Sequence, residues 1–206
     1  MRRPDLAVLI ENAQLIVESI GRESVDVYLF LSDEFARGPV TQNSVFQFVY
    51  RSFYRIDNAG LTPEFKSAYF QCLERSRAAL EVDLGVIAKK LHEIPNRKGD
   101  ASLQFSFVTK LANTINPSYP IYDAEVAKVF DFRAPYNYKS FDTRLQEYLA
   151  FYRFLRQFYE EIIAQGSMKE LIELFEKTYS PAAARVPLAK ILDFTFWSAG
   201  KLSGKL

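Results

Sequence analysis

The chain has 206 residues, of which 49% are hydrophobic and 15% aromatic, so it can bury a large core within one domain. The formal net charge is only +1, which argues against a purely electrostatic, histone-like nucleic-acid binder but is compatible with a local basic face. One cysteine and one histidine exclude an internal disulfide, a cysteine cluster for zinc or iron–sulfur, and a histidine-rich metal site. We therefore expect neither a metal nor an organic cofactor.

The N-terminal segment and the hydropathy pattern bear on location. Polar residues, among them Glu11, Asn12 and Gln14, interrupt the first amphipathic segment, so it does not resemble a secretory signal. The chain contains no run of about 18 apolar residues, the length that a membrane span requires. We expect a cytoplasmic protein with no membrane partner.

Helical periodicity dominates the chain and strand alternation is scarce, which predicts an all-α fold of about nine or ten helices. Thr62, Pro63 and Glu64 show the features of a helix start, because they supply a cap, a proline in the first turn and an early acid. The expected helices span 5–20, 25–35, 44–56, 62–80, 82–94, 101–115, 123–130, 142–165, 168–179 and 187–200. The helix at 142–165 is apolar on most sides, so we expect it in the centre of a bundle.

The most polar connector runs from Asn96 to Asp100. Polar stretches with glycine are typical of loops between packed units. We predict one domain over 1–206, made of two packed lobes with a boundary near 95–101.

One segment, 105–130, is typical of a chemical site. It carries Lys110 on an apolar helix, then the loop Asn-Pro-Ser-Tyr-Pro, then Asp123 at the expected start of the next helix. A nucleophilic lysine must be neutral, and an apolar environment lowers its pKa. A purely structural interpretation stays open: Asp123 as an ordinary helix N-cap, and Lys110 as a surface residue or a member of a structural ion pair.

This order of lysine, loop and aspartate resembles the catalytic core of the helix-hairpin-helix DNA glycosylases, the group that includes endonuclease III and the 8-oxoguanine glycosylases. The run from the lysine through Asn-Pro to Pro-Ile-Tyr-Asp is also similar to a group of uncharacterised bacterial proteins.

The glycosylase resemblance implies a DNA partner and excision of a modified base, for example 8-oxoguanine. Lys110 would attack C1′ of the sugar, and Asp123 would stabilise the positive charge that develops there or help to deprotonate the lysine. Tyr119 and Tyr122 would stack on the extruded base, and Phe107 would belong to the apolar wall of the substrate site.

Two further interpretations stay open. The family has two glycines just before the lysine, where their amides approach a DNA phosphate, and this chain has Ser106 and Val108 in those places. The substitutions favour a non-catalytic nucleic-acid-binding protein or a protein-interaction module with a protein partner. The order of Lys110 and Asp123 favours the enzyme.

Overall fold

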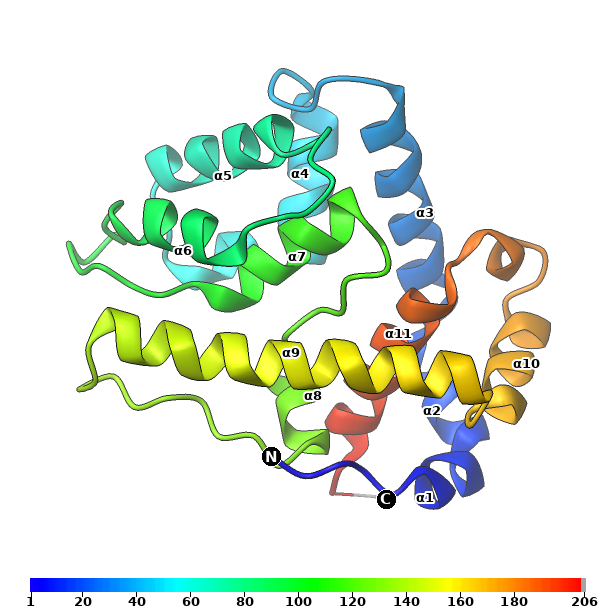
Figure 1. The fold of residues 1–206 in the computed structure, drawn as a ribbon. Helices are drawn as coiled ribbons and strands as arrows, with labels where there is room; N and C mark the ends of the chain where they lie inside the picture. The colour runs from blue at the N-terminus through cyan, green and yellow to red at the C-terminus, as the bar shows by residue number, and fades with distance from the viewer. Residues whose placement is uncertain (205–206) are drawn as a thin grey trace.

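The computed structural model describes residues 1–204, and over this range the chain forms helices joined by loops, with no strand (Figure 1). The all-α prediction is therefore confirmed. The helices are α1 (Leu6–Glu11), α2 (Ala13–Ile20), α3 (Arg22–Arg37), α4 (Ser44–Phe53), η1 (Ile56–Ala59), α5 (Pro63–Arg75), α6 (Leu84–His92), α7 (Phe105–Ile115), α8 (Ala124–Val129), α9 (Phe141–Gln165), α10 (Lys169–Thr178), η2 (Ala182–Arg185) and α11 (Leu188–Leu202).

Several helix bounds differ from the prediction. The first helix is broken at Asn12, whose side-chain amide donates to the carbonyl of Val8 at 2.8 Å. An asparagine that bonds to local backbone competes with helix continuation. The helix that begins at Pro63 ends at Arg75 rather than near residue 80, and α7 begins at Phe105 rather than at residue 101. The two 3₁₀ helices were not predicted, since four residues are too few to show a period.

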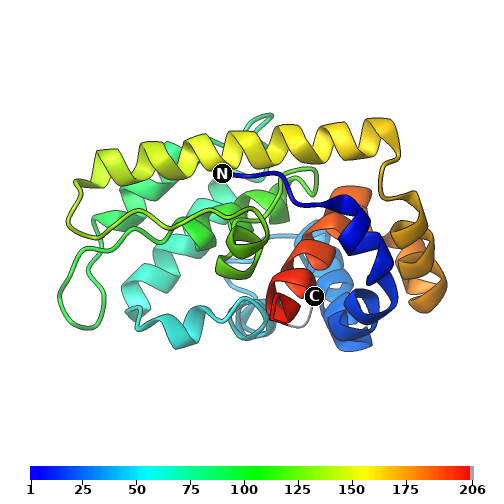
Figure 2. The ribbon, with the colours of Figure 1, turned by 90° about the horizontal axis from the view of Figure 1, so that it is seen from below.

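The helices form two groups joined by one long helix. Helices α4 to α7 lie on one side of the molecule, α1 to α3 with α10 and α11 lie on the other, and α9 runs along both (Figures 1 and 2). Buried apolar residues from both groups belong to a single continuous core. The connector at 93–104, which includes the predicted lobe boundary, joins α6 to α7, and these two helices contact one another. That connector therefore runs within one group of helices.

The central helix is α11, and the expectation that α9 would be central is wrong. Eleven of the fifteen residues of α11 are buried, against seven of the twenty-five in α9. Figure 2 shows α9 along one edge of the molecule. Helix α9 has many apolar residues because one of its faces covers both groups of helices. Some of its other apolar residues lie near the surface. No helix within residues 1–204 combines the length and the apolar character that a bilayer span requires.

Helices α8 and α11 approach each other closely at Gly200. A Cβ atom added to Gly200 would lie 2.1 Å from the carbonyl oxygen of Glu125, so no larger residue fits without a shift of the backbone. This contact fixes α8 on the central helix, and with it the segment that carries Asp123.

Candidate active site

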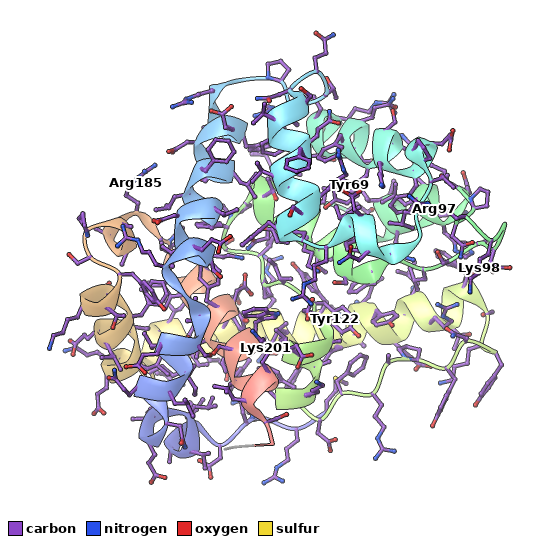
Figure 3. All side chains as sticks on the ribbon, turned by 180° about the vertical axis from the view of Figure 1, so that it is seen from behind. Tyr69, Arg97, Lys98, Tyr122, Arg185 and Lys201 are labelled. Carbon is purple, nitrogen blue, oxygen red and sulfur yellow. The ribbon has the colours of Figure 1, made fainter. Side chains whose placement is uncertain are left out.

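A cleft of about 610 Å³ opens between the two groups of helices, with α7, α8 and α11 contributing to its walls. Its cations are Arg55, Lys110, Lys190 and Lys201, and its aromatic side chains are Phe53, Tyr54, Phe194 and Trp197. Figure 3 labels Lys201 on α11, which lines the cleft, as well as Tyr122 in the segment before α8. The size is within the usual range for small-molecule sites. The lining combines flat apolar surface with these cations and with the acidic residues Glu23, Asp123, Glu125 and Asp193.

Lys110 lies on α7 and is only 8% exposed. Its Nζ donates to Oδ2 of Asp123 at 3.1 Å and to Oγ of Ser106, one turn earlier, at 3.0 Å. Two aromatic rings flank the amine, with Nζ 5.2 Å from the ring centre of Phe107 and 5.8 Å from that of Tyr54. The structure therefore brings Lys110 and Asp123 together in one cleft.

The pKa of Lys110 is lowered from its ordinary value, chiefly because burial penalises the charged form. The carboxylate of Asp123 opposes this shift because it favours the charged ammonium. The positive charge of Arg55 lowers the pKa of Lys110 further. The amine thus loses its proton more readily than a free lysine, yet it keeps a counter-ion while protonated. A nucleophile that must alternate between these two states benefits from both influences.

Asp123 is the N-cap of α8 and the counter-ion of Lys110 at the same time. Its Oδ1 accepts from the backbone amide of Glu125 at 3.1 Å, while its Oδ2 accepts from Lys110. Asp123 therefore has both roles, since Oδ1 caps the helix and Oδ2 pairs with the lysine. The cap fixes the orientation of the carboxylate, so the ion pair is defined by backbone geometry and not only by side-chain rotamers.

The neighbours of Lys110 on α7 hold the loop that leads to Asp123. Thr109 Oγ1 accepts from the amide of Tyr122 at 3.0 Å, and the amide group of Asn113 donates to the carbonyl of Tyr119 at 2.7 Å. About one turn of α7 thus presents a loop anchor, the lysine and a second loop anchor. The register between the lysine and the aspartate is set by these buried hydrogen bonds.

A second buried pair, Lys190 and Asp193, lies on α11 and was not singled out from the sequence. Both residues line the cleft, and their side chains are 3% and 4% exposed. Burial raises the pKa of Asp193 to about 6 and lowers that of Lys190. The signal was present: two charged residues three positions apart on an otherwise apolar helix fall on one face.

The three predicted substrate-binding aromatics do not line the cleft. The ring of Tyr122 packs in the core against Phe105 and Tyr148, and Tyr119 is buried under the guanidinium of Arg156, 4.8 Å from its ring centre. Phe107 is also buried, and it contacts the site only through the Lys110 amine. To stack on a base, Tyr119 and Tyr122 would have to leave these positions, so we do not assign that role to them.

The two positions that hold glycines in the glycosylases lie inside α7. The amide of Val108 donates to the carbonyl of Gln104 at 3.2 Å, and its side chain is fully buried. That amide is therefore not available for a phosphate. Arg55, by contrast, lines the cleft.

Within residues 1–204, no three histidine, cysteine, aspartate or glutamate side chains are grouped so that they could hold a metal ion. Comparisons with models of protein families, with curated proteins and with solved structures gave no match. The glycosylase resemblance therefore rests on the segment that contains Lys110 and Asp123.

Proposed function

We propose that this protein is a DNA N-glycosylase with lyase activity that removes a modified base, for example 8-oxoguanine, by using Lys110 as the nucleophile. One observation carries the proposal: Nζ of Lys110 lies 3.1 Å from Oδ2 of Asp123 in a cleft large enough for an extruded base. A buried amine with a lowered pKa and a positioned carboxylate supplies the two groups that this chemistry needs.

The reaction begins with the loss of a proton from the Lys110 ammonium to water, either directly or through Asp123, which passes the proton on and remains a carboxylate. The neutral amine attacks C1′, a C–N bond forms, and the bond between C1′ and the base breaks with its electron pair leaving on the base. Positive charge develops on the sugar during this step, and the carboxylate of Asp123 stabilises it. Ring opening then gives a Schiff base between Lys110 and C1′, from which the 3′ phosphate can be eliminated.

The aromatic residues of the cleft suit an extruded base better than those predicted from the sequence. Trp197 and Phe194 on α11, together with Phe53 at the end of α4, line the same cleft as the lysine. Flat apolar side chains stack on any base and exclude water from the reacting bond. Trp197 is partly exposed, and Nζ of Lys201 lies 4.3 Å from its ring centre.

Two non-catalytic functions are the alternatives. A nucleic-acid-binding protein without chemistry is favoured by the buried amide of Val108, which removes one anchor that the glycosylases use. A protein-interaction module is favoured by Val45 and Phe48 on α4, which are 61% and 63% exposed.

Covalent trapping separates these functions. The protein is mixed with duplexes that carry 8-oxoguanine, uracil or an abasic site, borohydride is added, and adducts are separated on a denaturing gel. We expect an adduct with the wild type that disappears in Lys110→Gln. The matched control is Lys66→Gln, because this lysine on α5 pairs with Asp57 and does not line the cleft.

Three other outcomes of the trapping experiment contradict the proposal. An adduct that persists in Lys110→Gln removes this residue as the nucleophile. Salt-dependent retention of DNA with no adduct on any duplex identifies a non-catalytic binder. The absence of both adduct and retention at low salt leaves the protein-interaction module as the function.

A further inference from the structure

The ammonium of Lys190 faces the cleft with unused hydrogen-bonding capacity. The residue is 2% exposed and its Nζ lies 4.8 Å and 5.1 Å from the ring centres of Phe194 and Tyr28. Among the described residues, its one carboxylate neighbour within salt-bridge range is Asp193, with Oδ2 at 3.7 Å, which is beyond hydrogen-bonding distance. An ammonium carries three donors, so this one can donate to a molecule bound in the cleft that it lines.

The carboxylate of Asp193 is already engaged by other donors. Its Oδ1 accepts from the amide of Ile121 at 2.9 Å and from the hydroxyl of Tyr159 at 3.1 Å, and its Oδ2 accepts from the amide of Asn113 at 3.2 Å. Asp193 therefore acts first as a structural acceptor that holds the loop before α8. It offers Lys190 a compensating charge nearby without occupying its donors.

We propose that Lys190 is a second catalytic residue of the same cleft, whose ammonium binds the departing base and donates a proton to it. The inference rests on the proposed function and adds a leaving-group role to it. As the bond between C1′ and the base breaks, the electron pair remains on the base; a proton moves from Nζ of Lys190 to that base, and Lys190 becomes a neutral amine. The substrate class is a base with a ring carbonyl oxygen, which can accept from the ammonium before the bond breaks.

The electrostatics of the cleft support a proton donor at this position. Burial lowers the pKa of Lys190, and the positive charge of Lys110 in the same cleft lowers it further, while Asp193 opposes both. A more acidic ammonium transfers its proton more readily to a developing anion. The two lysines thus have complementary tasks, since Lys110 must be neutral to attack and Lys190 must be charged to donate.

Two substrates distinguish this role from a structural one. Excision of 8-oxoguanine or uracil requires a leaving base, whereas trapping on an abasic duplex requires only Lys110. In Lys190→Met, which keeps a similar volume, we expect the single-turnover rate of base excision to fall by about 100-fold or more. Trapping on the abasic duplex should stay within about threefold of the wild type, because no base departs there. Lys169→Met is the control, since this lysine on α10 is exposed and does not line the cleft.

Unchanged excision in Lys190→Met overturns the inference, and so does a parallel loss of excision and abasic trapping in a variant that keeps the wild-type circular dichroism. If the variant does not fold, the wild type is tested with duplexes containing uracil, 5-fluorouracil and 5-chlorouracil. A proton donor makes the excision rate only weakly dependent on the acidity of the leaving base, and a steep dependence overturns the proposal. An absence of abasic trapping by the wild type overturns the proposed function itself.

Discussion

At the scale of single residues, the unusual feature is that two lysines are buried beside one cleft. Lysine is almost never fully buried without a partner, and here Lys110 and Lys190 are 8% and 2% exposed. Removing an ammonium and a carboxylate from water costs free energy that their attraction recovers only with good geometry. Two such pairs in one place are a poor way to stabilise a fold. The proposed chemistry would need shifted pKa values of this kind.

The pKa of Asp193 predicts how stability depends on pH. Burial raises it from 3.8 to about 6, so between these values the folded protein holds a proton that the unfolded chain has released. The free energy of unfolding therefore falls as the pH rises through this window, by something on the order of 3 kcal/mol for this group. The side chain of Asp193→Asn does not titrate, so this variant lacks the pH-dependent part of the free energy of unfolding that Asp193 contributes.

Urea titrations of both proteins from about pH 4 to about pH 6 measure the effect. The wild type should lose stability relative to Asp193→Asn as the pH rises. A difference between the two proteins that stays constant across the window contradicts a raised pKa in the folded state.

At the scale of secondary structure elements, local signals predicted the starts of capped helices well and the places of helices in the fold poorly. Thr62 and Asp123 cap the helices that the sequence indicated, because a cap depends on residues within one turn. The proximity of Lys110 and Asp123 also follows from a short connection. The pairing of Asn113 with Asp193, 80 residues apart, depends on how α11 packs, and no local pattern contains that information. The predicted central position of α9 was wrong for the same reason, because the place of a helix in the fold depends on contacts between residues far apart in the sequence.

The contact between α8 and α11 predicts a sensitive position. Gly200→Ala places a Cβ against the carbonyl of Glu125, so either α8 or α11 must shift. We expect a loss of stability of about 1 to 3 kcal/mol, with weaker pairing of Lys110 and Asp123 because α8 carries the aspartate at its start.

Gly38→Ala is the control, because an added Cβ there meets no atom within 4 Å and its φ of 165° is extended backbone. Thermal unfolding of both variants measures the effect. Equal melting temperatures for the two variants would show that α8 and α11 separate at little cost.

At the scale of the whole molecule, a single hydrophobic core joins the two groups of helices. A shared core predicts one cooperative transition. We expect the fluorescence of Trp197, the one tryptophan of the chain, to change at the same denaturant concentration as the helical circular dichroism. Two separated transitions would instead support lobes that unfold independently, which is how the predicted boundary near 95–101 can be tested.

The position of α11 in the chain also has a consequence for biosynthesis. This helix supplies Lys190, Asp193 and one wall of the cleft, and it contacts α2, α8, α9 and α10. A ribosome makes it after every other described helix, so the nascent chain holds Lys110 and Asp123 long before their surroundings exist. Lys110 therefore stays without the wall that α11 supplies until residues 188–202 have left the ribosome and packed, and a chain that ended before α11 would lack this part of the cleft.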